Sequence, residues 1–352
     1  MSRVAPSPPA IHSVWHLGAA PAVSTDAWVL IGQDGGQSID LGDDVLFVFA
    51  DTLLADRSAW RAVPGSRRWP IGRDQGRFLA NCCARAGRGR LTTELGRLRY
   101  VLGADGWPKE IVQAAAVERL TRTRFWPAHG TAVDGRVYLY YLGIEHFAPD
   151  STWGFRNLGT GLAVVDPVSG DAERLRWDGD WRLWPAGDGD LHGGVQVLRD
   201  GEHVYVFGTV RDGYEITARL GRVEAGAMAD RDAYEYLAAD TPAWSGDPSK
   251  ACSLGRCGPE LSVSYNAWLG GYLMCFVEPY GRALCVRFAE SLWGPYSAPA
   301  RLGDLPTDAR HDMAALAFEH PMFATEGGRV IALTYCQPNF TQNGVVGVRL
   351  ES

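Results

Sequence analysis

Five ionisable residues open five similar segments of the chain: Asp34, His129, His192, Glu260 and His320. Their carboxyl and imidazole groups are among those that most often transfer protons in enzymes. Cleavage of a glycosidic bond needs two carboxyls that flank the bond. One protonates the leaving oxygen, and the other activates water or attacks the anomeric carbon. Carbohydrate chemistry is therefore the first function to consider for this set of residues.

Each of these residues opens the same layout of a short alternating strand, a tight turn and a second apolar strand. The turns are glycine-containing and lie at Gly42–Asp44, Asp134–Gly135, Asp200–Gly201, Gly270–Gly271 and Gly327–Gly328. Glycine supplies the positive φ that tight hairpin turns require. The segments start 95, 63, 68 and 60 positions apart, so each leaves room for one or two further strands.

Repeated units of antiparallel strands are typical of a β-propeller, in which radial repetition leaves only short sheet edges. We therefore predict an all-β, five-bladed β-propeller. We expect a single domain over residues 1–352, in which about the first 12 residues are disordered. A lectin-like sandwich or two stacked β-domains are the structural alternatives.

The innermost strand of each propeller blade lines the central channel, so the five segment starts are expected to open onto one face. Asp51 ends a second strand that returns to this face. We predict Asp34, Asp51 and Glu260 as catalytic carboxylates. Glu260 begins an apolar strand, where an unpaired buried carboxylate would be costly. In the structural alternative, Asp34 forms a turn and Asp51 accepts backbone N–H groups.

Histidine and aromatic residues near the same positions predict substrate binding. The expected binding residues are His129, His192, His320, Trp126, Tyr265 and Asn266. Aromatic faces stack on sugar rings, while imidazole and amide groups bond hydroxyls. A lone histidine is more often structural, but three in register favour a shared role. Most of the 13 tryptophans are expected to fill the space between blades.

The charge and composition of the chain argue against several classes of binding partner. The net charge is −7 and no basic stripe is present, so nucleic acid and anionic membranes are poor partners. No apolar run reaches the roughly 20 residues of a membrane span. Met1–Ala10 carries one charge and no apolar segment, so we expect a cytoplasmic protein. The expected partner is a small-molecule or oligosaccharide substrate, bound by a monomer.

Motifs for other chemistries are missing from the sequence. It has no phosphate-binding glycine loop, no Gly-x-Ser-x-Gly elbow and no His-Glu-x-x-His helix. We therefore expect no cofactor, although a structural Ca²⁺ ion in the channel would fit a propeller. Five of the seven cysteines lie in apolar runs and are expected to be small buried core residues: Cys82, Cys83, Cys275, Cys285 and Cys336.

Several short motifs resemble the DUF4185 family. Asp34–Ser38 and Phe49–Thr52 resemble its opening motif, although Ala50 replaces the usual glycine. Trp126–Pro127, Gly258–Asn266, Trp293–Ser297 and His320–Pro321 resemble later landmarks in the same order. The family is similar to five-bladed propeller glycoside hydrolases, and some members are endo-D-arabinanases. The resemblance implies that Asp34 and Asp51 are catalytic or substrate-orienting acids, with Glu260 as a third acidic partner.

Three functions remain open from the sequence. The first is a glycoside hydrolase-like enzyme that uses paired carboxylates. The second is an intracellular enzyme of specialised metabolism that catalyses transfer, elimination or cyclisation. In that case the histidines would do more of the acid–base work, because imidazole titrates near neutral pH. The third is a sugar-binding propeller without catalysis.

Overall fold

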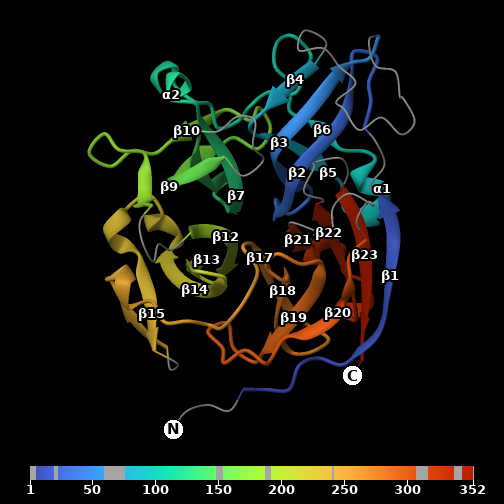
Figure 1. Cartoon of the computed structure of the whole chain (residues 1–352), viewed down its shortest axis with the longest axis vertical. Coiled ribbons are helices and arrows are strands. Elements are labelled where there is room, and N and C mark those ends of the chain that lie inside the picture. Colours follow the sequence, from blue (N-terminus) through green and yellow to red (C-terminus); the bar gives the residue numbers. More distant parts are fainter. Residues whose placement is uncertain are drawn as a thin grey trace.

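The computed structural model describes residues 5–19, 23–58, 76–147, 154–186, 192–239, 242–306, 316–336 and 343–351. Within these ranges the chain forms 23 strands in five antiparallel sheets. The sheets stand around a common axis like the blades of a propeller (Figure 1). The predicted five-bladed β-propeller is therefore confirmed.

The first three blades each contain five strands in the described residues. Blade I contains β2 (Trp28–Asp40), β3 (Val45–Asp56), β4 (Gly76–Leu79), β5 (Cys82–Ala86) and β6 (Arg99–Tyr100). Blade II contains β7 (Thr123–Val133), β8 (Arg136–His146), β9 (Phe155–Val165), β10 (Ala172–Arg174) and β11 (Arg182–Pro185). Blade III contains β12 (His192–Asp200), β13 (His203–Asp212), β14 (Glu215–Glu224), β15 (Glu235–Ala239) and β16 (Ala243–Ser245).

The last two blades each contain four strands in the described part of the chain. Blade IV contains β17 (Leu261–Asn266), β18 (Gly271–Val277), β19 (Ala283–Ala289) and β20 (Ala300–Asp304). Blade V contains β21 (Leu316–Glu319), β22 (Val330–Cys336), β23 (Asn343–Leu350) and β1 (Ile11–Ala19). The strand nearest the N-terminus thus pairs with the strand nearest the C-terminus, as the blue and red ribbons of Figure 1 show. This pairing closes the ring.

Helices are short and lie outside the blades. The α-helices are α1 (Leu91–Leu95) and α2 (Ala116–Leu120). The 3-10 helices are η1 (Ala225–Ala227), η2 (Arg231–Ala233), η3 (Pro248–Lys250), η4 (Pro321–Phe323) and η5 (Glu326–Gly328). Within the described ranges, none of the helices has the length and apolar character needed to cross a membrane.

The innermost strands of the five blades are β2, β7, β12, β17 and β21. The predicted first strands of four segments fall on β2, β7, β12 and β17. The fifth was expected to start at His320, and this expectation is wrong. Blade V begins with β21, which ends at Glu319, and the following Pro321–Phe323 form η4. Proline lacks the N–H that a continuing ladder would need.

Three innermost strands have an irregular register at their centres. In β2 the pairing with β3 shifts between Gln33 and Gly35 and again before Gln37. The corresponding shift lies between Pro127 and Gly130 in β7 and between Gly193 and Gln196 in β12. Bulges bend a strand and redirect its side chains. Asp34 and His129 both lie within these irregular stretches.

Five hydrophobic clusters fill the five interfaces between neighbouring blades. Phe47 and Phe49 of blade I, for example, pack with Phe323 and Val345 of blade V. The other four clusters join blades I and II, II and III, III and IV, and IV and V. In the cluster between blades II and III, the rings of Tyr140 and Trp184, both from blade II, stack with centroids 5.8 Å apart. The core is therefore distributed around the ring.

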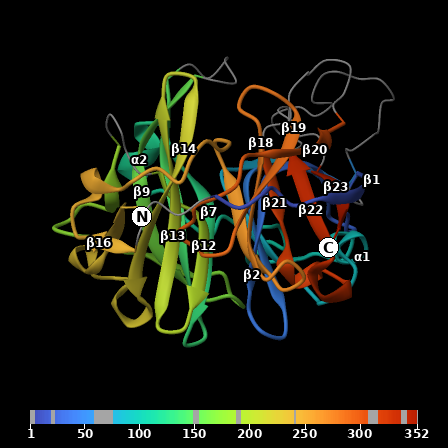
Figure 2. The ribbon, with the colours of Figure 1, turned by 90° about the horizontal axis from the view of Figure 1, so that it is seen from below.

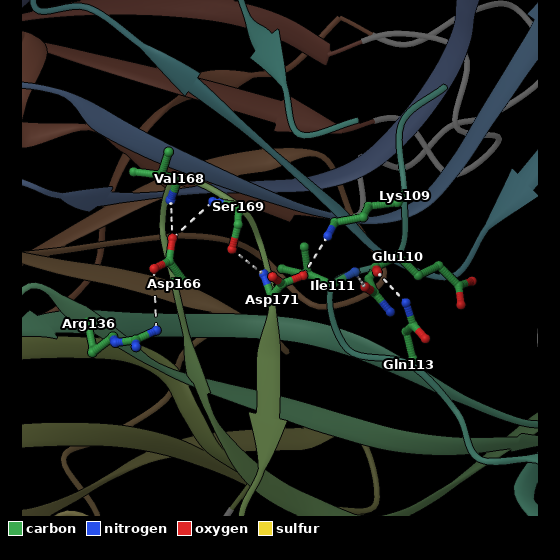
Figure 3. Close-up of polar contacts among 10 residues, drawn as sticks. Lys109, Glu110, Ile111, Gln113, Arg136, Asp166, Val168, Ser169 and Asp171 are labelled. Carbon is green, nitrogen blue, oxygen red and sulfur yellow. Dashed lines mark hydrogen bonds and ion pairs between the residues drawn. The ribbon is translucent and has the colours of Figure 1, made fainter. Parts of the chain in front are cut away.

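A polar contact also ties the β6–β7 connection to blade II (Figure 3). Lys109 Nζ donates to Asp171 Oδ1 at 2.8 Å. Beside it, Asp166 Oδ1 accepts the N–H groups of Val168 and Ser169, both at 2.9 Å. Arg136 lies 3.3 Å from the other Asp166 oxygen. Because Asp166 fixes the β9–β10 turn, Asp171 is held where Lys109 can reach it.

Candidate active site

Asp34 lies at the bulge of β2, next to Asp51 on β3. Gln33 pairs with Thr52 and Gly35 pairs with Phe49, so Asp34 lies opposite the stretch that contains Asp51. The Gly35 N–H donates to Asp34 Oδ1 at 2.8 Å. Gly35 has a φ of +77°, and a Cβ there would lie 3.2 Å from the Ala50 nitrogen. Glycine thus allows the backbone bend that presents Asp34.

Asp51 is a buried carboxyl with one clear donor. Asp51 is only 6 % exposed, and Trp126 Nε1 donates a hydrogen bond to Asp51 Oδ1 at 2.9 Å. Burial, aided by the charge of Asp34, raises the pKa of Asp51 to about 7, while the Trp126 hydrogen bond opposes the shift. Trp126, predicted as a substrate-binding residue, thus lies beside this carboxyl, and its N–H orients Asp51.

Glu260 reaches the same site from blade IV. It immediately precedes β17 and is half-buried. Gln37 Nε2, on β2, donates to Glu260 Oε2 at 3.0 Å and links the two blades. Burial, aided by the charge of Asp34, raises the pKa of Glu260 to about 8. A carboxyl with this pKa carries its proton at neutral pH.

Asp34 couples the three carboxyls. Its charge contributes to the raised pKa of both Asp51 and Glu260. Burial also raises the pKa of Asp34 itself, and hydrogen bonds from Gly35 and Cys336 oppose this shift. Such an arrangement of two or three carboxyls with separated proton affinities supplies an acid and a base at one place. Among the described residues, no group of three or more His, Cys, Asp and Glu side chains is placed to hold a metal ion.

Cys336 is a site residue that the sequence reasoning missed. Its thiol lies at the end of β22, donates to the Gly35 carbonyl at 3.0 Å and interacts with the Asp34 carboxyl. Burial raises the pKa of this thiol well above its usual range, so it stays protonated. The apolar run around Cys336 predicted only a small core residue. No local signal reveals a contact with a residue some 300 positions earlier.

His129 and His320 have both ring nitrogens occupied by the protein. His129 Nδ1 accepts the Val197 N–H at 3.2 Å, so Nε2 is the nitrogen that donates to the Ser38 carbonyl, at 3.1 Å. His320 bonds Ser38 Oγ at 2.7 Å and Thr334 Oγ1 at 2.8 Å. Burial lowers the pKa of His129 to about 4 and that of His320 to about 3. Neutral, fully bonded imidazoles of this kind connect the strands of four blades.

The model of the DUF4185 family, described as a domain of unknown function, matches residues 19–335. The chain belongs to the DUF4185 family. No functionally curated protein matches it.

Two solved structures illustrate what the DUF4185 chain is similar to. One is a hydrolase candidate from Bacteroides ovatus, with a TM-score of 0.63, 16 % identity, and coverage of 92 % of this chain and 87 % of that one. The other is the α-L-arabinofuranosidase PaAbf62A from Podospora anserina in complex with cellotriose. Its TM-score is 0.50 at 9 % identity, with 98 % of each chain covered. At these identities the likeness concerns the fold.

Of the three remaining predicted binding residues of the DUF4185 chain, two lie away from the carboxyls. Tyr265 and Asn266 are at the other end of β17, about 16–20 Å from Glu260 at the usual rise per strand residue. Asn266 donates to the Gly328 carbonyl at 2.8 Å and accepts the Leu269 N–H at 3.0 Å. His192 opens β12 and pairs with Thr209. Its side chain lies outside the described residues.

A fourth buried carboxyl, Glu319, was also missed. It precedes His320 and is 5 % exposed. Ser264 Oγ donates to its Oε2 at 2.6 Å, and its own N–H donates to Ser262 Oγ at 2.9 Å. Burial raises the pKa of Glu319 to about 7. These contacts join β21 to β17. Glu319 was missed because the innermost strand of the fifth segment was predicted to begin at His320, one residue after β21 ends.

Proposed function

We propose that this DUF4185 protein is a glycoside hydrolase-like enzyme that acts through Asp34, Asp51 and Glu260. The observation that carries the proposal is the coupling of Asp34 to both other carboxyls across blades I and IV. Two carboxyls with different proton affinities on either side of a glycosidic bond are what hydrolysis requires. The propeller fold of the similar structures supports the same class of activity.

Glu260 is proposed as the general acid. Its raised pKa keeps the proton on the carboxyl at neutral pH, and Gln37 orients it through one oxygen. The other oxygen is then available to protonate the leaving group. As the bond breaks, negative charge on the leaving oxygen is neutralised by this proton.

Asp34 is proposed as the base or nucleophile. The Gly35 N–H at 2.8 Å and the Cys336 thiol stabilise its charged form. Asp51 would then orient and tune Asp34 from the neighbouring strand, held in place by Trp126. Whether Asp34 attacks carbon or activates water depends on its separation from Glu260 when substrate is bound.

Arabinofuranosides are the first substrate class to test. The motifs resemble those of endo-D-arabinanases, and the Podospora enzyme is named as an α-L-arabinofuranosidase. The test measures hydrolysis of aryl furanosides, aryl pyranosides and soluble D-arabinan by the wild type and by Asp34→Asn, Asp51→Asn and Glu260→Gln. On soluble D-arabinan, we expect each variant to lose at least about 100-fold in kcat/KM with unchanged folding. Full turnover by all three variants would contradict the proposed site.

The leaving group separates the two main roles. The phenol of an activated aryl glycoside is acidic enough to leave without receiving a proton. Glu260→Gln should therefore lose little activity on such a glycoside and much activity on a polysaccharide. Asp34→Asn should lose activity on both. Equal losses for Glu260→Gln on both substrates would assign the acid elsewhere.

The histidine-based alternative receives no support from the site. His129 and His320 are neutral and have both ring nitrogens bonded within the protein. A sugar-binding propeller without catalysis is the remaining outcome of the test. It would bind saccharides with the same carboxylates but release no product.

A further inference from the structure

The propeller carries an exposed pair of tyrosines that the proposed reaction does not use. Tyr214 lies in the turn between β13 and β14 and is 85 % exposed. Tyr280 lies in the connection between β18 and β19 and is 54 % exposed. The two rings meet edge to face, with centroids 5.8 Å apart and planes at 75°. Side chains from blades III and IV thus form one aromatic cluster on the surface.

Arg211 joins this cluster from the end of β13. Its Nη1 donates to the Tyr280 hydroxyl, and its guanidinium carbon lies 5.6 Å from the centre of the Tyr280 ring. We call Arg211, Tyr214 and Tyr280 the tyrosine rim. The rim combines two apolar ring faces with a cation that retains further N–H donors.

The rim opens on the same side of the propeller as Glu260. Leu261 pairs with Phe276, so the β18–β19 connection continues past the end of β17 at which Glu260 lies. Likewise His192 pairs with Thr209, so the β13–β14 turn lies beyond the start of β12. Figure 2 shows both turns toward the upper edge of the view, opposite the β2–β3 turn.

Hydrogen bonds fix the β13–β14 hairpin to the segment that leads to Glu260. Thr209 Oγ1 donates to the Pro259 carbonyl at 3.1 Å. On β14, the Ile216 carbonyl accepts the Cys257 N–H at 2.9 Å, and the Ala218 N–H donates to the Gly255 carbonyl at 3.0 Å. These hydrogen bonds hold the β13–β14 hairpin, which carries Arg211 and Tyr214, against the segment that ends at Glu260.

The backbone holds Tyr280 in an unfavourable conformation. Its φ is +60°, in the left-handed region that bulky residues seldom adopt. Observed strain of this kind clusters at ligand-binding positions, because the surroundings must hold the residue there. At Tyr280 the strained backbone directs the ring toward solvent, next to the exposed ring of Tyr214. Burial of apolar surface therefore does not offset the cost of the strain.

We propose that the tyrosine rim is an outer carbohydrate-binding subsite for the leaving part of a long saccharide chain. The ligand class follows from the chemistry: the negative face of an aromatic ring attracts the C–H groups on a sugar face, and arginine donates to hydroxyls. The direction rests on the proposed function. If Glu260 protonates the leaving oxygen, sugar units on its side of the site are those that leave.

Binding without turnover is the first test. Native gels that contain soluble D-arabinan, L-arabinan or arabinoxylan are run with the wild type, Tyr214→Ala, Tyr280→Ala and the double variant. We expect at least one polysaccharide to retard the wild type and each single variant to bind it about tenfold more weakly. The matched control is Tyr265→Ala, an exposed tyrosine at the far end of β17, which should migrate like the wild type.

Kinetics form the second test. The variants should keep the wild-type kcat/KM on a small aryl glycoside and lose about tenfold on the retarding polysaccharide, mainly through KM. Such a split supports the subsite, because a folding defect would reduce activity on both substrates. Melting temperatures within about 2 °C of the wild type would confirm that these surface changes leave the fold intact.

The outcomes separate this proposal from the proposed function. Retardation that depends on the two tyrosines, without hydrolysis of any substrate, would support the rim and contradict the enzyme. Equal binding by wild type and double variant would overturn the rim, whatever the hydrolysis result. So would a wild type that no polysaccharide retards, or one whose rim instead joins two copies of the chain, seen as a concentration-dependent dimer that the double variant loses.

Discussion

Three carboxyls that share one half-buried site cannot all be ionised at neutral pH, since each negative charge raises the energy of the next. Asp34 is the member whose charge acts on the other two. Burial raises the pKa of Asp34 as well, but donors from the Gly35 backbone and from Cys336 oppose this shift and stabilise the charged form. The protons are therefore expected to stay on Glu260 and, in part, on Asp51.

Activity should fall at alkaline pH. A general acid works only while protonated, so kcat/KM should drop about tenfold per pH unit above pH 8, the raised pKa of Glu260. The measurement is a pH profile of kcat/KM on a substrate with a poor leaving group. A profile that stays flat to pH 10 would show that Glu260 is not the acid.

Removal of the Asp34 charge should lower the pKa of Glu260. In Asp34→Asn the repulsion is gone while burial remains, so the pKa should fall below 8 but stay above its ordinary value. The titration is followed through the carboxyl carbon signal of Glu260. Glu319→Gln is the control, because Glu319 does not contribute to the shift at Glu260.

Glu260 should also weaken the fold at high pH. Its pKa is raised on folding, so between about pH 4.5 and 8 the folded state binds a proton that the unfolded state lacks, and stability falls as pH rises through that window. Glu260→Gln carries no such penalty. Its melting temperature should therefore exceed that of the wild type by about 2–6 °C more at pH 8 than at pH 5. An equal margin at both values would contradict the raised pKa.

At the scale of elements, the bulge of β2 is the device that brings two aspartates together. A regular ladder would place alternate residues on opposite faces at fixed intervals. The two register shifts around Gly35 insert extra residues and direct Asp34 toward the stretch around Asp51. The site therefore depends on backbone conformation as much as on the acidic side chains.

Gly35→Ala tests this dependence. The new Cβ would meet the Ala50 nitrogen at 3.2 Å, at a φ of +77° that alanine resists. We expect at least a tenfold loss of kcat and a destabilisation of about 1–3 kcal/mol. Gly42→Ala is the control: its φ is +87° with nothing within 4 Å, in the β2–β3 turn, so it should lose stability but keep activity. Equal activity of the two variants would contradict the role of the bulge.

Local patterns predicted these elements where the physics is local. Glycine turns such as Asp134–Gly135 predict hairpins because positive φ is a requirement of the turn itself. This is why Asp34, Asp51 and Glu260 could be chosen from the sequence. The hydrogen-bond partners of His129 and His320 could not be predicted. Whether an imidazole bonds a substrate or Ser38 depends on its side-chain rotamer and on how the neighbouring blades pack.

At the scale of the whole molecule, the ring is closed by strand pairing between its two ends. β1 is the outer strand of blade V and pairs with β23 from Ile11 opposite Leu350 to Ala19 opposite Gly344. The sequence pattern predicted five hairpins but gave no role to β1, because the partner of an outer strand more than 300 residues away leaves no local signal. β1 also packs beside blade IV, because Ile11 and Val14 lie against the hydrophobic cluster between blades IV and V.

Deletion of residues 1–19 should therefore destabilise the entire propeller. Without β1 the edge of β23 is exposed, and the hydrophobic cluster between blades IV and V loses the side chains of Ile11 and Val14. We expect the melting temperature to fall by about 10 °C or more, with aggregation on heating. Deletion of residues 1–9, which precede β1, serves as the control and should melt like the full chain. Calorimetry and light scattering measure both effects.

The pairing of β1 with β23 also sets the order of events during folding. β1 leaves the ribosome more than 300 residues before its partner strand, β23. Until then blade V lacks both of these strands, and the open ring presents unpaired edges at which chains can associate. Contacts this distant in sequence also slow the search for the native state. The nascent chain therefore has to keep β1 unpaired until β23 has been made.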